Sequence, residues 1–184
     1  MDDDTIESSL IEFPEFKDSY VVGIVANTHG ILRKDVLDAF ADCDMIIHGG
    51  DIGDETILDQ LITIAPVVAV RGNGDTDQWA IGFPLKQRIR VGNSQLFVIH
   101  NINDFDEERV DEIDAVIFGP SHQPKVETRG NALFVNPGSA GPKHFNWPIT
   151  VAKIRIDGGE VSAEIIELDG RRPVEGVRGR LSAG

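Results

Sequence analysis

Apolar residues in the first half of the chain fall into short runs that polar turns separate. Continuous apolar segments predict buried strands at 20–26, 44–48 and 67–70. Between these strands, apolar residues at helical spacing predict helices over 32–41 and 55–64. The alternation of strands and helices indicates parallel β-α-β units with right-handed crossovers.

The second half of the chain has a different pattern, in which pairs of strands are joined by short turns. An acidic stretch at 104–114 predicts a short helix, and Asp157-Gly158-Gly159 predicts the turn of a hairpin on the outside of the fold. Parallel strands therefore give way to antiparallel ones, which indicates an α/β sandwich. The predicted strands of this half are 87–91, 95–100, 115–118, 126–128, 133–136, 149–156 and 160–168.

The two ends of the chain differ from its centre. Residues 1–18 are acidic and predict a loosely ordered leader, residues 19–169 predict one domain, and residues 170–184 predict a mobile tail with four Arg. The acidic start, Met1-Asp2-Asp3-Asp4, is unlike a secretory signal, which begins basic and continues apolar. The apolar runs are far shorter than the roughly 20 residues that a membrane-spanning helix needs, so we expect no membrane partner.

The net negative charge of the chain disfavours polyanions as partners. The sequence has 31 acidic and 17 basic residues, a net charge of −14, and this excess repels nucleic acid backbones and anionic membranes. We therefore expect no general nucleic-acid surface. An Asp-rich and Lys-poor composition indicates a cytoplasm of high ionic strength, as in an extreme halophile, and an ordinary acidic protein is the alternative. The single Cys43 excludes an internal disulfide and fits a reducing cytoplasm, whereas the sequence leaves open whether a homo-oligomer forms.

Polar residues follow five of the predicted strands at the point where each strand ends. In α/β sheets, binding sites lie beyond the carboxyl ends of the strands. Imidazoles suit transition metals, and carboxylate and amide oxygens complete such sites. The pattern therefore predicts a metal site along one sheet edge. The polar residues are Asn27 and His29, Asp51, Asn73 and Asp75, His100, and His122.

These residues, in this order, resemble those of the calcineurin-like metallophosphoesterases. The motifs are Asn27-x-His29, Gly50-Asp51, Gly72-Asn73-x-Asp75, His100 and Gly119-x-x-His122. Residues 68–75 and 133–139 are similar to the small prokaryotic phosphodiesterase branch of that family, and the resemblance covers residues 20–168. It implies a four-layer α/β/β/α sandwich with two mixed sheets, and a binuclear centre of Mn, Ni, Fe or Zn that hydrolyses phosphate esters.

The resemblance also implies a role for each residue. Asn27, His29, Asp51 and His122 would surround the first metal ion, and Asp51, Asn73 and His100 the second. Asp51 would bridge the two ions, and Asn73 would also touch the phosphate, so these two residues are the candidate catalytic residues. Two such ions clamp a phosphate and lower the pKa of a bridging water.

Two departures from the family motifs weaken the expected centre. The family has Asp where this chain has Asn27, which keeps one oxygen donor and loses a negative charge, so the first ion is expected to be held less tightly. The family has His where this chain has Pro120, so the second ion loses one imidazole. We therefore expect one or two divalent ions, held less tightly than in a complete site.

Three further polar residues have a structural explanation as well as a functional one. His48 is expected to pack beside the site rather than to bind metal. Asp54 is a helix cap or a site residue, and Asp75 orients the Asn73 loop or lies near the metals. Asn136-Pro137-Gly138-Ser139 either approaches the site or is a structural turn, and the structural turn is favoured.

Two functional hypotheses follow. The first is a metal-dependent phosphoesterase that hydrolyses phosphodiesters among small phosphorylated substrates, by a metal-bound hydroxide at a binuclear or weakened binuclear centre, with manganese among its metals. The second is a catalytically impaired scaffold of the same fold that binds a protein partner. Asn27 and Pro120 favour the scaffold. The retained motif residues favour the enzyme, and they are His29, Asp51, Asn73, His100 and His122.

Overall fold

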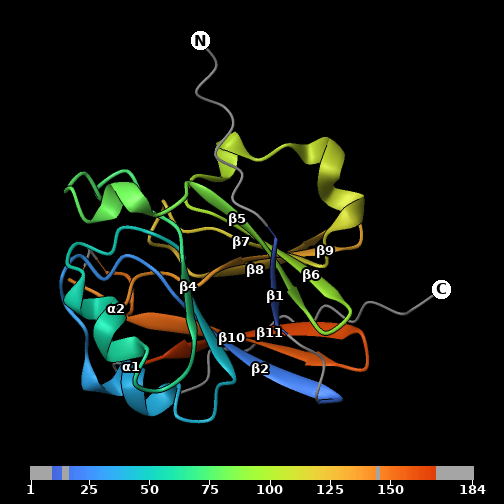
Figure 1. Cartoon of the computed structure of the whole chain (residues 1–184), viewed down its shortest axis with the longest axis horizontal. Helices are drawn as coiled ribbons and strands as arrows, with labels where there is room; N and C mark the ends of the chain where they lie inside the picture. Colours follow the sequence, from blue (N-terminus) through green and yellow to red (C-terminus); the bar gives the residue numbers. More distant parts are fainter. Residues whose placement is uncertain (1–9, 14–16, 144–145, 169–184) are drawn as a thin grey trace.

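Two mixed β-sheets lie against each other in the computed structural model, which describes residues 10–13, 17–143 and 146–168 (Figure 1). The six-stranded sheet has the order β1-β5-β6-β7-β9-β8, and the five-stranded sheet has the order β11-β10-β2-β3-β4. The strands are β1 (Ile11–Phe13), β2 (Ser19–Val25), β3 (Met45–His48), β4 (Val67–Ala69), β5 (Lys86–Val91), β6 (Ser94–Ile99), β7 (Ala115–Ile117), β8 (Lys125–Arg129), β9 (Ala132–Asn136), β10 (Thr150–Asp157) and β11 (Glu160–Glu167). The helices are α1 (Lys34–Ala39) and α2 (Thr56–Leu61), and the 3-10 helices are η1 (Ala80–Gly82), η2 (Ile102–Asp104) and η3 (Glu107–Glu112).

The predicted β-α-β half is confirmed. Strands β2, β3 and β4 pair in parallel, with α1 and α2 as the crossovers between them. All four residues of β3 are buried, which is why this segment reads as a continuous apolar run instead of an alternating one. Parallel pairing brings the carboxyl ends of the three strands to the same end of the sheet.

One prediction about the remaining elements needs correction, and two are refined. Residues 11–13, placed in the leader by the sequence analysis, form β1, which pairs in parallel with β5 at the edge of the six-stranded sheet. The short helix expected over 104–114 is the 3-10 helix η3 and not an α-helix, because this acidic stretch has too few apolar residues to bury one face of an α-helix. The predicted hairpin is β10–β11, in which β11 forms the edge of the five-stranded sheet and β10 also pairs with β2.

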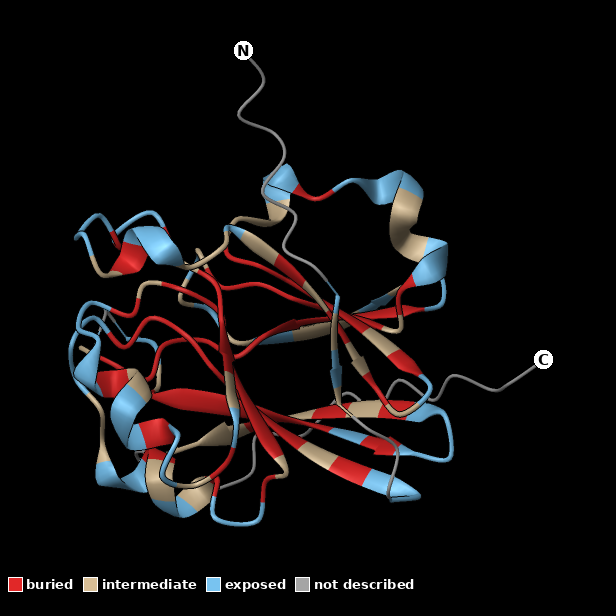
Figure 2. Ribbon diagram, viewed as in Figure 1, coloured by how far each residue is buried: buried red, intermediate tan, exposed pale blue. Residues whose placement is uncertain are grey.

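Three buried clusters account for the layers (Figure 2). The first fills the space between the sheets and includes Ile24, Ile47 and Val98. The second lies between the five-stranded sheet and helices α1 and α2, and the third lies on the outer face of the six-stranded sheet under η2 and η3. The predicted sandwich of two mixed sheets is therefore confirmed, with 3-10 turns in place of α-helices on one outer face.

Gly23, in the centre of β2, gives a test of the packing between the sheet and α1. A Cβ atom at this position would lie 2.9–3.0 Å from the ring of Phe40, which is fully buried. We expect Gly23→Ala to lower the free energy of unfolding by about 1–3 kcal/mol, because the ring has no space to move. Urea denaturation measures the change, and Gly82→Ala is the control, since no atom lies within 4 Å of a Cβ there. Equal stability of the two variants would contradict this account of the packing.

The predicted tail at 170–184, and residues 1–9 and 14–16 of the predicted leader, lie outside the described residues. Within the described part of the chain, no helix is both long enough and apolar enough to cross a membrane.

Candidate metal centre

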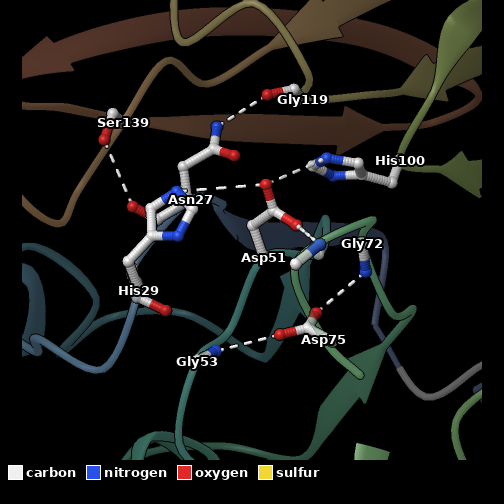
Figure 3. Close-up of polar contacts among 12 residues, drawn as sticks. Asn27, His29, Asp51, Gly53, Gly72, Asp75, His100, Gly119 and Ser139 are labelled. Carbon is white, nitrogen blue, oxygen red and sulfur yellow. Dashed lines mark hydrogen bonds and ion pairs between the residues drawn. The ribbon is translucent and has the colours of Figure 1, made fainter. Parts of the chain in front are cut away.

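The predicted site residues come from both sheets. Asn27, His29 and Asp51 follow β2 and β3 of the five-stranded sheet, whereas His100 and His122 follow β6 and β7 of the six-stranded sheet. The expectation of a site along one sheet edge is therefore wrong. The site lies where loops from the two sheets converge (Figure 3).

The backbone is strained at four of the six predicted ligands. Asn27, His29, Asp51 and His122 have φ angles of 56°, 45°, 55° and 57°, and in the described part of the chain they are the non-glycine residues with positive φ. L-residues rarely adopt this conformation, and such strain is found at functional sites where the surrounding structure enforces it. The four residues lie on three separate loops that meet at the site, so the strained residues are concentrated at one place in the fold.

Asp51 lies at the centre of the group. Its Oδ1 accepts a hydrogen bond of 2.8 Å from the backbone amide of Gly74, and its Oδ2 lies 3.3 Å from Nε2 of His100 and 3.9 Å from Nε2 of His29. Burial alone would raise the pKa of Asp51, but the bonds from His100 and Gly74 lower it to about 2. The side chain is therefore a carboxylate at neutral pH, with Oδ2 directed at two imidazoles.

His100 is buried and held from both sides. Its Nδ1 lies 2.7 Å from the carbonyl oxygen of Gly49, so Nδ1 carries a hydrogen and Nε2 faces Asp51. Burial would lower the pKa of His100, but Asp51 and the Gly49 carbonyl outweigh burial and raise it. His100 therefore forms an ion pair with Asp51 when it is protonated, and offers Nε2 as a ligand when it is neutral.

His29, Asp51 and His122 together offer three ligand atoms that all lie within 4.8 Å of one another. The rings of His29 and His122 stack with centroids 5.3 Å apart. His29 is exposed, and Asp51 and His122 are half-buried, so an ion has access from solvent. Two imidazoles and a carboxylate are a donor set that suits a borderline transition metal.

Asn27 is completely buried, and its amide has a fixed orientation. Its Nδ2 donates to the carbonyl oxygen of Gly119 at 2.6 Å and to that of Gly138 at 3.0 Å. Because both neighbours are acceptors, nitrogen must occupy this position and Oδ1 the opposite one. Oδ1 is buried without a hydrogen-bond partner and points toward the Asp51 carboxylate (Figure 3). An acceptor left unpaired in this way fits a ligand to a cation.

The structure places Asn73 and Asp75 differently. Asn73 is exposed at the tip of the turn after β4, next to the Gly74 amide that binds Asp51. Asp75 is buried and accepts hydrogen bonds from the amides of Gly53 at 3.0 Å and Gly72 at 2.8 Å. Asp75 therefore joins the Asp51 loop to the Asn73 loop, which favours the orienting role over a position among the ligands.

His48 lies beneath the site rather than in it. Its Nδ1 accepts from the Gly50 amide at 3.2 Å, and its Nε2 lies 2.9 Å from Oγ1 of Thr28, whose hydroxyl donates to the carbonyl of Ile52. Both ring nitrogens are therefore engaged, with the hydrogen on Nε2. Full burial lowers the pKa of His48 to about 4, which keeps the ring neutral.

Several residues that fix the site had no clear signal in the sequence. Thr28 orders the Asn27 loop through His48, and Ser139 Oγ donates to the carbonyl of Asn27 at 3.2 Å. The turn 136–139 does approach the site, since its Gly138 carbonyl binds the Asn27 amide. Asp54 accepts from the amide and hydroxyl of Thr56 at the start of α2, so it fits a helix cap.

The Asp51–His100 pair predicts how the stability of the metal-free protein depends on pH. A raised histidine pKa contributes stability below the ordinary value of about 6.5, and this is lost as pH rises through the folded-state pKa. We therefore expect His100→Gln to destabilise the protein more at pH 5 than at pH 9. Urea denaturation of both chains with a chelator present measures the difference, and a penalty that grows with pH would contradict the assignment.

The sequence match agrees with this geometry. The model of the calcineurin-like phosphoesterase superfamily domain matches residues 21–159, and the chain belongs to this family. A probable metallophosphoesterase of Methanothermobacter thermautotrophicus is 31% identical over 159 residues, which cover 79% of this chain and 91% of that protein. One of Methanocaldococcus jannaschii is 33% identical over 166 residues, covering 81% and 82%. The phosphodiesterase YfcE of Escherichia coli is 35% identical over 89 residues, covering 44% and 48%.

Solved structures share the fold. The phosphoesterase YfcE of Escherichia coli aligns with a TM-score of 0.65 at 24% identity and covers 86% of this chain and 98% of that one. Vps29 of Entamoeba histolytica, solved in complex with Zn²⁺, aligns with a TM-score of 0.70 at 22% identity and covers 88% and 99%. At these identities the likeness shows the fold alone, and this fold holds an enzyme in one case and a vacuolar sorting protein in the other.

Proposed function

We propose that this protein is a metal-dependent phosphoesterase that acts on phosphodiesters, with one or two divalent ions held among Asn27, His29, Asp51, Asn73, His100 and His122. The observation that carries the proposal is the convergence of His29, Asp51 and His122, with ligand atoms within 4.8 Å of one another, in a chain whose residues 21–159 match the family model. The phosphodiesterase YfcE, a relative over 89 residues, supports the substrate class.

The residues of the site divide the work between holding the metal and binding the substrate. A divalent ion in such a site polarises the phosphate and lowers the pKa of a bound water. Asp51 stays ionised because its pKa is about 2, and it sets the position of any ion between the imidazoles. Asn73 lies on the exposed turn next to Gly74, whose amide binds Asp51, and we propose that its side-chain amide donates a hydrogen bond to a phosphate oxygen.

The setting of the reaction follows from composition. We propose a cytoplasmic enzyme that works at high ionic strength, since a net charge of −14 repels anionic substrates at low salt and salt screens that repulsion. Manganese is the first metal to test, with nickel, iron and zinc as the alternatives that suit mixed nitrogen and oxygen ligands.

The deciding experiment measures hydrolysis of bis(p-nitrophenyl) phosphate by the full chain in about 2 M KCl, which screens the surface charge. Native protein is compared with and without Mn²⁺, and with Pro120→His. We expect turnover that a chelator abolishes and Mn²⁺ restores, and an increase in turnover in Pro120→His, which regains an imidazole at the second metal position. Bound Mn²⁺ without turnover in either chain would overturn the proposal.

A scaffold that binds a protein partner is the second candidate. Two observations favour it: the two departures from the family motifs, Asn27 and Pro120, and the Vps29 structures that share this fold. Metal binding without turnover in the native chain, followed by turnover in Pro120→His, would favour this function over the enzyme.

A further inference from the structure

The six predicted ligands are not equally prepared for metal. The residues with strained backbones are those assigned to the first ion, Asn27, His29, Asp51 and His122, whereas Asn73 and His100 have no positive φ. Strain of this kind costs roughly 1–3 kcal/mol per residue and persists only where neighbouring structure enforces it. The fold therefore preorganises one of the two positions.

The second position has fewer prepared ligands. Of the residues assigned to it, Asp51 is shared with the first position, and His100 Nε2 lies 3.3 Å from Oδ2 of Asp51. Asn73 is exposed, and Pro120 has no side-chain ligand to offer. A second ion would therefore have His100 as its single imidazole, whereas the first position has His29 and His122.

Asn27 determines the charge of the first position. Its Nδ2 is fixed by two carbonyl oxygens at 2.6 and 3.0 Å, so its unpaired Oδ1 points the other way, toward the Asp51 carboxylate (Figure 3). An Asp side chain here would direct its second oxygen at those same two carbonyls. Two acceptors at this distance repel a carboxylate, or force it to take up a proton. The site is therefore built for an amide.

We infer that this chain binds one divalent ion tightly, between Asn27 Oδ1, His29, Asp51 and His122, and that Asn27 is a neutral ligand which Asp does not replace. The inference rests on the metal centre of the proposed function but not on hydrolysis. One carboxylate among four ligands leaves the ion with a net positive charge, which favours binding of an anion such as a phosphate ester.

The test is calorimetric titration of the metal-free full chain with Mn²⁺ in about 2 M KCl, with bound metal counted by mass spectrometry after dialysis. We expect one ion per chain, bound at least about tenfold more tightly than any second ion. His100→Ala is expected to keep that affinity within about threefold, whereas His122→Ala weakens it more than about a hundredfold. Two ions of equal affinity, no bound ion, or an ion lost equally in both variants would overturn the inference.

The role of Asn27 has its own comparison. We expect Asn27→Asp to weaken binding of the first ion by about tenfold or more, although the substitution adds a negative charge. Asn131→Asp, at an exposed turn, makes the same charge change away from the site and is expected to leave the affinity unchanged. Tighter binding by Asn27→Asp than by native protein would overturn the inference. If Asn27→Asp does not fold, as circular dichroism would show, the stoichiometry and the two histidine variants decide.

Hydrolysis, assayed separately on the same samples, distinguishes the two proposals. One bound Mn²⁺ without turnover supports the single-ion inference and contradicts the phosphodiesterase. Two equivalent Mn²⁺ ions with turnover contradict the single-ion inference and support the phosphodiesterase.

Discussion

Asp51→Asn is expected to reduce metal-dependent phosphodiester hydrolysis by about a thousandfold or more. Such a loss in kcat/KM corresponds to about 4 kcal/mol of transition-state stabilisation. The reason is that Asp51 is the carboxylate among the three clustered ligands, so the variant loses the negative charge that holds a cation between His29 and His122. The fold is expected to survive, because the Asn amide oxygen still accepts the hydrogen bond from Gly74.

Asp54→Asn is the matched control for this prediction. Asp54 lies three residues further along the same loop, is exposed, and bonds to the amide and hydroxyl of Thr56. We expect this variant to keep native kcat/KM with Mn²⁺, at a small loss of stability. Steady-state kinetics and metal content, measured for both variants, check the pair. An Asp51→Asn chain that retains native turnover or native metal content would show that Asp51 is not at the centre of the site.

The sequence carried the parts of the fold that local pattern determines. Continuous apolar runs predicted β2, β3 and β4, because strands buried on both faces leave no polar position in between. The short helix expected over 104–114 is a 3-10 helix and not an α-helix, because its apolar residues, Phe105, Val110 and Ile113, are too sparse to form a continuous stripe. Phe105 and Ile113 instead contribute to the cluster under the 3-10 turns.

The sequence predicted candidate residues for the site but not their arrangement. The family motifs identified Asn27, His29, Asp51, His100 and His122, and the structure brings the loops that carry them together. The sequence did not show that both sheets contribute residues to the site. The order of strands in a sheet depends on pairings between distant segments, such as β10 with β2.

The orientation of Asn27 is the clearest case of information that the sequence lacked. The amide is fixed by carbonyl groups 92 and 111 residues away in the chain, at Gly119 and Gly138. From the sequence, Asn in place of Asp kept one oxygen donor and lost a negative charge. The two carbonyl groups show in addition that the amide is held in one orientation, with its oxygen directed away from them.

The second large effect concerns the backbone strain at His29, where φ is 45°. Glycine adopts positive φ without the steric cost that alanine incurs, about 1–2 kcal/mol, but loses about 0.4–1 kcal/mol through its more flexible unfolded chain. In metal-free protein we therefore expect His29→Gly to be more stable than His29→Ala by about 0.5–1 kcal/mol. Both variants lose the imidazole, so the difference between them isolates the backbone.

Added metal is expected to stabilise the native protein more than either His29 variant. A ligand at about a thousand times its Kd stabilises the folded state by about 4 kcal/mol, and both His29 variants should lose most of this gain. Thermal and urea denaturation, with chelator and with Mn²⁺, measure both effects. The same Gly and Ala pair at Asp59, an exposed position in α2, is the control, and there Ala should be the more stable by about 1 kcal/mol. If glycine gave no advantage over alanine at position 29, the strain would not be a property of this loop. If glycine is the more stable residue at position 29, the strained backbone at His29 lowers the stability of the metal-free protein while it holds the imidazole in position for an ion.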